Sequence, residues 1–210
     1  MSSYLSEEEQ VEALKKWWKQ NGTSVIAGVV LGFGIIFGWQ GWNVYQTSQG
    51  EGASILYTSM ENQLAQGDTN AGVETAKRLI GEFGSSAYAT YAALQLAQVS
   101  YVQGEKEAAR SHLQWAMDNA PDKTLAELAR LRLAYLLMDM QQWQAAEALV
   151  SAAGEMMAGE FALLRGDLAN QRGDTAAARA AYQEALDKGV HQGDLVRMKL
   201  IETGNGGAAS

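Results

Sequence analysis

The longest apolar stretch of this chain, VIAGVVLGFGIIFGWQGW, runs from Val25 to Trp42 and contains no charged side chain. As a helix, its 18 residues would be about 27 Å long, close to the ~30 Å hydrocarbon thickness of a bilayer. A soluble helix keeps one polar face, but this stretch is apolar on all sides. It predicts a transmembrane helix over residues 23–45, with interfacial aromatic residues at Trp17, Trp18, Trp39, Trp42 and Tyr45.

From Ser54 onward the apolar residues recur at helical spacing, and short polar turns interrupt them at regular intervals. The turns are 37, 37 and 32 residues apart and lie at Gly67-Asp68, Gly104-Glu105, Gln141-Gln142 and Gly173-Asp174. A period of this size, with a helix on each side of every turn, is typical of tetratricopeptide-like repeats. The pattern predicts an all-α chain in which a helical-hairpin solenoid occupies residues 46–205, and an ordinary helical bundle is the alternative.

Small residues recur where the two helices of a repeat would touch. The last copy has Gly166 before its turn and Ala178, Tyr182 and Ala185 after it. Small side chains let helices approach closely, and larger ones fill the space between them. We count three credible copies, an eroded first copy with Met60, Gly72 and Ala76, and a capping helix near residues 195–201.

The charges flanking the apolar stretch predict its orientation. Lys15, Lys16 and Lys19 precede it, and no lysine or arginine follows it until Lys77. Basic residues remain on the cytoplasmic side of a membrane. We therefore expect residues 1–22 to form a cytoplasmic amphipathic tail and the repeats to lie outside, in the periplasm of a bacterium, as in a single-pass type II protein.

A cleaved signal peptide is the alternative to a signal anchor. Its apolar part would be shorter and would end in small residues. Gly50 and Gly52 are small enough for a peptidase, but the stretch is long and its exit carries Trp39, Trp42 and Tyr45. The pattern favours an uncleaved anchor.

Charge restricts the partners of the repeat region. The chain has net charge −8, and its first 46 residues hold four glutamates and three lysines. The remaining 13 basic and 20 acidic residues give net −7, which disfavours nucleic acid and anionic lipid. Cysteine is absent, so disulfides and thiolate metal sites are excluded. Residues 206–210 are expected to be a disordered C-terminus.

Few residues suggest catalysis. His112 and His191 are isolated, and neither belongs to a metal-binding pair. No nucleophile elbow, phosphate loop or paired carboxylate motif occurs. We therefore expect a protein that is not an enzyme, with no catalytic residues, cofactor or metal.

The first helix of each repeat in such a solenoid lines its concave face. Counting from the small contact residue, the second and third copies would present a mostly apolar and aromatic set of side chains there: Tyr91, Leu94, Gln98, Tyr101, Leu128, Leu131, Tyr135 and Met138. A groove of this kind suits an extended or hydrophobic polypeptide. Alternatively, a terminal helix of the chain fills the groove and these are core residues.

Glycines form two stripes within the apolar stretch. Gly28 and Gly32 make one stripe with Ser24, and Gly34 and Gly38 make another. Small residues four apart let a second membrane helix pack closely. The stripes predict helix packing in the membrane, although glycine is also simply common in membrane helices.

Two segments together resemble the YfgM family of ancillary subunits of the bacterial SecYEG translocon. They are the tail YLSEEEQVEALKKWWKQNG (Tyr4–Gly22) and the end of the anchor, WQGWNVYQ. The resemblance spans the whole chain and implies a single-pass inner-membrane protein with a periplasmic tetratricopeptide-like domain. It also implies association with SecYEG and with a membrane-anchored periplasmic chaperone similar to a prolyl isomerase.

The sequence as a whole predicts a membrane-anchored adaptor that links emerging periplasmic and outer-membrane polypeptides to periplasmic chaperones. The alternative implied by the resemblance is a regulatory scaffold whose cytoplasmic tail restrains an envelope-stress response regulator. Whether the groove binds clients or only a fixed partner is left open by the residues.

Overall fold

The computed structural model describes residues 7–206, and this part of the chain is helical without strands. Its elements are α1 (Glu7–Ala65), α2 (Thr69–Phe83), α3 (Ala87–Val102), α4 (Lys106–Asn119), α5 (Lys123–Asp139), α6 (Trp143–Ser151), α7 (Ala158–Gln171), α8 (Thr175–Asp187) and α9 (Gly193–Gly206). The chain divides into two compact units, residues 1–49 and 50–210. Residues 207–210, most of the expected disordered C-terminus, lie outside the described part, and Gly206 ends α9.

The first unit contains the apolar part of α1. Residues Gln10–Gln40 are long and apolar enough to cross a membrane, with a mean hydropathy of 1.8 in their most apolar window. Only 6% of that window is buried, so nearly all of its side chains are exposed. A Cβ added at Gly28, Gly32, Gly34 or Gly38 would meet nothing within 4 Å. The two glycine stripes therefore stay a prediction about a partner helix.

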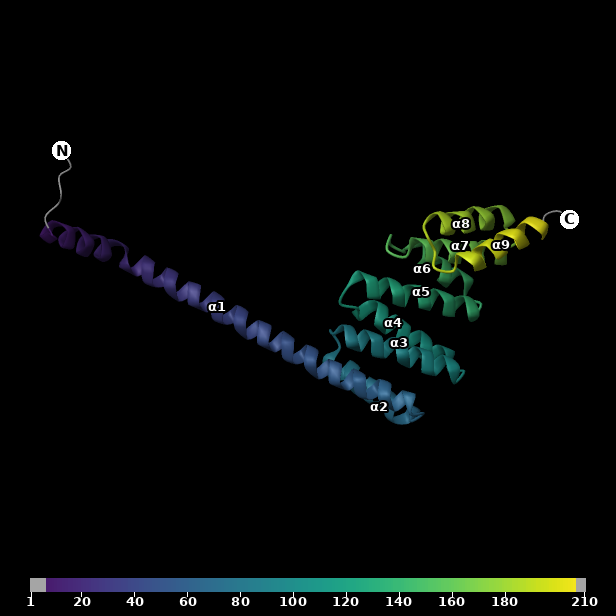
Figure 1. The fold of residues 1–210 in the computed structure, drawn as a ribbon, viewed down its shortest axis with the longest axis horizontal. Coiled ribbons are helices and arrows are strands. Elements are labelled where there is room, and N and C mark those ends of the chain that lie inside the picture. The colour runs from purple at the N-terminus through teal and green to yellow at the C-terminus, as the bar shows by residue number, and fades with distance from the viewer. Residues whose placement is uncertain (1–6, 207–210) are drawn as a thin grey trace. The chain divides into compact units, whose positions relative to one another are not determined.

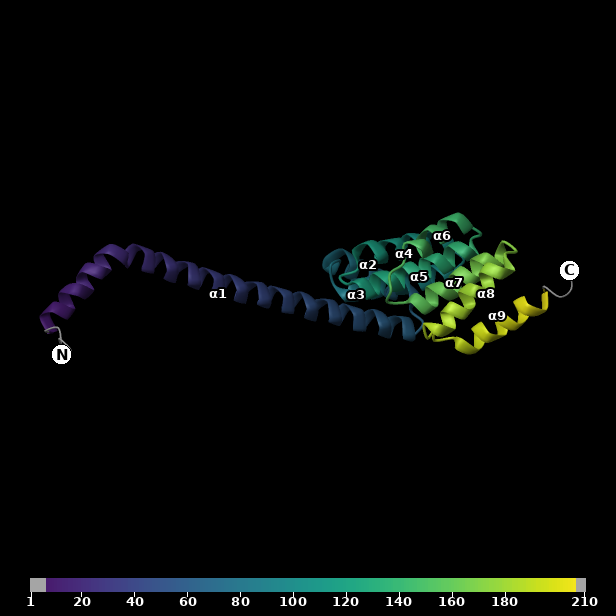
Figure 2. The same ribbon diagram turned by 90° about the horizontal axis from the view of Figure 1, so that it is seen from above.

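The second unit is a stack of helical hairpins (Figure 1). The C-terminal part of α1 pairs with α2, α3 with α4, α5 with α6 and α7 with α8, and α9 follows as a single helix. In Figure 2, α2, α4 and α6 lie on one side of the stack and α3, α5 and α7 on the other. The expectation of an all-α tetratricopeptide-like solenoid is confirmed, including a final helix over residues 195–201.

All four predicted turns are confirmed, and they share one backbone geometry. Gly67, Gly104 and Gly173 have φ of 81°, 81° and 77°, a left-handed conformation that glycine adopts without strain. At each turn the next amide bonds to a carbonyl five residues earlier, as in Glu105 N to Ser100 O at 2.8 Å, which closes the preceding helix. The turn at Gly189, φ 75°, follows the same pattern and precedes α9.

Gln141 has φ 59° at the third turn, where the other repeats have glycine. Replacing Gln141 with glycine should raise the free energy of unfolding by about 0.5–1 kcal/mol, because a side chain in this region is strained. Urea unfolding of the full chain in detergent measures the change. The matched control is Gln103→Gly, which replaces a right-handed cap residue (φ −76°) and should lower stability by about 0.5 kcal/mol. Equal effects of the two changes would contradict the role of φ.

Small residues lie where the repeats need them. Gly166, Ala178, Tyr182 and Ala185 are buried between α7 and α8. A Cβ on Gly166 would lie 2.3 Å from the Tyr182 ring. In the eroded first copy, Met60, Gly72 and Ala76 are also buried, so that copy packs like the others.

Candidate functional site

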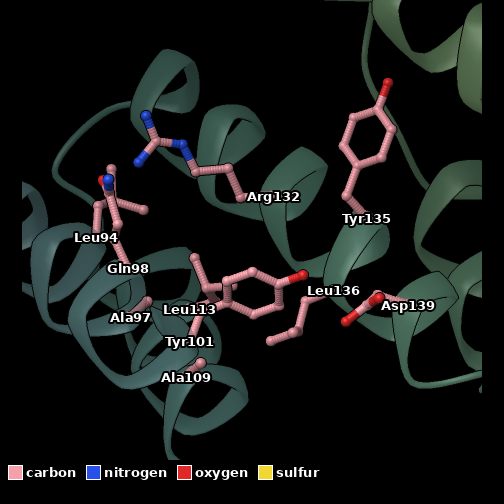
Figure 3. A pocket seen from close by; sticks show the side chains of 10 residues that line it. All are labelled: Leu94, Ala97, Gln98, Tyr101, Ala109, Leu113, Arg132, Tyr135, Leu136 and Asp139. Carbon is pink, nitrogen blue, oxygen red and sulfur yellow. The ribbon is translucent and has the colours of Figure 1, made fainter. Parts of the chain in front are cut away.

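A groove of about 300 Å³ opens between α3, α4 and α5. Its floor is apolar, and its walls carry two tyrosines, an amide and two charged side chains (Figure 3). The lining residues are Leu94, Ala97, Gln98, Tyr101, Ala109, Leu113, Arg132, Tyr135, Leu136 and Asp139. The groove is therefore built from two consecutive first helices, with the second helix α4 beneath them.

Four of the eight side chains proposed from the sequence line this groove, namely Leu94, Gln98, Tyr101 and Tyr135. Tyr101 and Tyr135 are 44% and 39% exposed, so a ligand can reach both rings. The structure thus brings these four side chains together, although those on α3 and the one on α5 are more than 30 residues apart in the sequence.

The other four proposed residues lie elsewhere. Leu131 is buried in the core that runs from α3 to α7, and Leu128 and Met138 pack against the same core. Tyr91 is 39% exposed and its ring centroid is 6.1 Å from that of Tyr57 on α1. For Leu128, Leu131 and Met138, a core position is thus the better description.

Sequence reasoning missed the two charged residues of the groove, Arg132 and Asp139. On α5 the residues that reach the groove are 132, 135, 136 and 139, whereas the spacing along the sequence predicted 128, 131, 135 and 138. The face of α5 toward the groove is shifted by about one residue. The spacing of Arg132, Tyr135 and Asp139, three and four residues apart, is the helical signal that could have found them.

The carboxylate of the groove is already paired. Lys106 Nζ lies 2.7 Å from Asp139 Oδ2, and this bond, with a further one from the Tyr101 hydroxyl, holds the pKa of Asp139 below its usual range. Burial, followed by the nearby charges of Asp167 and Glu160, raises the pKa of Tyr135 to about 12. The Tyr135 hydroxyl is therefore protonated at neutral pH and is able to donate a hydrogen bond to a ligand.

The two histidines lie away from the groove. His112 is partly buried on α4, and burial followed by the nearby Lys77 lowers its pKa. His191 precedes α9, is 93% exposed, and its Nδ1 lies 2.5 Å from Glu160 Oε1. Within residues 7–206, no group of three His, Cys, Asp or Glu side chains is arranged to hold a metal ion.

A sequence profile described as a tetratricopeptide repeat-like domain matches residues 15–205. A tetratricopeptide repeat protein of Thermus thermophilus, solved by crystallography, superposes with a TM-score of 0.50 at 20% identity, covering 72% of this chain and 80% of that one. This likeness supports the fold alone.

Three similar proteins are each named "Ancillary SecYEG translocon subunit". Those of Escherichia coli and Haemophilus influenzae are each 30% identical to this chain, covering 95% of it and 98% of their own length. That of Neisseria gonorrhoeae is 28% identical over 153 residues, covering 70% of each chain. Since the profile and the first two relatives span nearly the whole chain, this protein belongs to the YfgM family of ancillary SecYEG translocon subunits with a tetratricopeptide-like domain.

Proposed function

We propose that this protein is a non-enzymatic adaptor of the Sec translocon, anchored in the bacterial inner membrane by α1, whose repeats bind other proteins through the groove between α3 and α5. The observation that carries the proposal is the groove itself. It has an apolar floor and two exposed tyrosines, which suit an extended polypeptide. The names of the relatives support association with SecYEG.

The orientation belongs to the same proposal. Lys15, Lys16 and Lys19 precede the membrane-spanning part of α1, and the next basic residue is Lys77. By the positive-inside rule the tail is cytoplasmic and the repeats, residues 46–205, are periplasmic. The partners in that compartment are a membrane-anchored chaperone similar to a prolyl isomerase and polypeptides emerging from the translocon.

Photo-crosslinking tests the groove. A photoreactive residue at position 101 or 135 of the full chain, in intact cells, should yield products with a translocon subunit, a periplasmic chaperone or a nascent chain. The control position is Gln144, which is exposed on α6 and should yield few of these products. Crosslinks to none of the three classes from either groove position would overturn the proposal.

Two further experiments separate the adaptor from a regulatory scaffold. Protease added to spheroplasts should digest the repeats if they are periplasmic, and their protection would overturn the orientation. Deleting residues 2–20 should leave the periplasmic crosslinks in place if the protein is an adaptor. The exposed Val11, Leu14 and Trp18 suit a tail that binds a cytoplasmic protein. If deleting this tail abolishes the function of the protein while the periplasmic crosslinks remain, the regulatory role is favoured.

A further inference from the structure

The groove between α3 and α5 contains an arginine without a partner. Within the described part of the chain, Arg132 forms no salt bridge or side-chain hydrogen bond, whereas Asp139 in the same groove is paired with Lys106. A second groove, between α6, α7 and α8, differs in this respect. Both of its arginines are paired, Arg172 with Glu147 at 2.7 Å and Arg165 with Glu184 at 2.8 Å. The guanidinium of Arg132 is thus available to an anion that enters the first groove.

The position of Arg132 follows from the register of the helices. Tyr101 on α3 hydrogen-bonds Asp139 on α5 at one end of the groove. Seven residues earlier on each helix, about 10 Å away, are Leu94 and Arg132. Figure 3 shows the Arg132 guanidinium and the Gln98 amide on the same side of the groove, opposite Asp139. One end of the groove therefore carries two kinds of N–H donor, and the other end carries a carboxylate that is already neutralised.

The chemistry of that end fits a carboxylate. A guanidinium donates two parallel N–H bonds to a carboxylate, and an amide can add a third. Next to these donors the floor is apolar, with Leu94, Ala97 and Leu113. A ligand that satisfies both needs carries a carboxylate directly beside an apolar side chain. The last residue of a polypeptide has this arrangement on a single Cα.

Charge argues against an acidic peptide segment as the source of the carboxylate. Residues 47–210 carry a net charge of −7, which repels a run of aspartates or glutamates. A terminal carboxylate brings one negative charge, and Arg132 matches it. The groove of about 300 Å³ lies at the small end of the range for ligand pockets and suits one large side chain with its backbone.

We propose that Arg132 and Gln98 bind the free C-terminal carboxylate of a polypeptide whose last side chain is aromatic or aliphatic and lies on the apolar floor beside Tyr101 and Tyr135. The carboxylate site specifies which part of a polypeptide the groove recognises. It rests on the proposed function in one respect, namely that the groove binds polypeptide. It makes the end of a chain, rather than its interior, the feature that is recognised.

Peptide binding to the purified full chain in detergent tests this proposal. The probe is an uncharged ten-residue peptide that ends in Phe and carries a fluorophore at its N-terminus, measured by fluorescence anisotropy. The free acid should bind at least ten-fold more tightly than the same peptide with an amidated C-terminus, as expected for a charge-assisted hydrogen bond. A free-acid peptide ending in Ser should also bind more weakly, because it leaves the apolar floor empty.

Substitutions assign the effect to Arg132. Arg132→Gln should reduce binding of the free acid to the level of the amide and leave binding of the amide unchanged. The matched control is Arg179→Gln, an exposed arginine on α8, which should change neither affinity. Because Arg132 is also exposed, its replacement should not alter the thermal unfolding of the protein, which circular dichroism checks.

The other outcomes separate this proposal from the adaptor function. Equal binding of acid and amide, or an unchanged affinity in Arg132→Gln, overturns the carboxylate site, and crosslinks from positions 101 and 135 would still support the adaptor. If an amidated peptide with an internal Glu binds as tightly as the free acid, the carboxylate that is bound need not be the C-terminal one, and that part of the proposal is overturned. No peptide binding together with no crosslinks overturns both proposals.

Discussion

Replacing Gly166 with alanine is expected to lower the free energy of unfolding by about 2–3 kcal/mol. The new Cβ would lie 2.3 Å from two atoms of the Tyr182 ring, far inside van der Waals contact. The ring cannot move aside easily, because the Tyr182 hydroxyl donates a 2.8 Å hydrogen bond to Asp167 Oδ1. Lys199 on α9 holds the same oxygen at 2.6 Å, so a shift of the ring would disturb three helices.

The matched control for this change is Gly81→Ala on α2. A Cβ at Gly81 meets nothing within 4 Å, so alanine should raise stability by about 0.5–1 kcal/mol through its better helix propensity. Urea unfolding of both variants as full chains in detergent, followed by circular dichroism, measures the difference. If Gly166→Ala is as stable as Gly81→Ala, the close packing of α7 against Tyr182 is not a constraint on the fold.

Replacing Glu127 with alanine is expected to lower the free energy of unfolding by about 3 kcal/mol. Glu127 is 7% exposed on α5 and accepts hydrogen bonds from Arg130 Nη1 at 2.5 Å and from the Gly154 amide at 2.9 Å. Arg130 in turn donates to the carbonyl of Ala152 at 2.7 Å. The change therefore removes the support of the connection between α6 and α7 and leaves the Arg130 charge without its partner.

An exposed pair provides the comparison. Glu82→Ala breaks a 2.7 Å pair with Arg78 on α2, in which both side chains are about half exposed. Water screens this pair, so its loss should change stability far less than the loss of Glu127 does. The same urea experiment measures both variants. Similar losses at positions 127 and 82 would contradict the assignment of Glu127 as the support of the loop.

The repeats were predictable from the sequence because they depend on local rules. A left-handed turn favours glycine, so Gly67, Gly104 and Gly173 marked the turns directly. Close helix contact requires small side chains, so Gly166 and Ala178 marked the interface of α7 and α8. The long apolar part of α1 was equally clear, since its length and hydropathy alone are enough for it to cross a membrane.

The groove was only partly predictable because it depends on how one helix is turned against its neighbours. On α5, Leu131 enters the core and Arg132, the next residue, reaches the groove. The rotation of α5 about its own axis is set by packing in three dimensions. The spacing of apolar residues in the sequence predicts this rotation only to within about one residue position. The pairing of Lys106 with Asp139 joins residues 33 positions apart, which no local pattern indicates.

The geometry of the groove has a consequence for the mechanics of the solenoid. Every residue that lines it comes from α3, α4 or α5, which precede the short helix α6 and the connection held by Glu127 and Arg130. Repeats of this kind touch only their immediate neighbours. A displacement of α7, α8 and α9 at that connection would therefore change the surroundings of Tyr135, which lies near Asp167 and Glu160 of α7, but not the packing among α3, α4 and α5 that forms the groove.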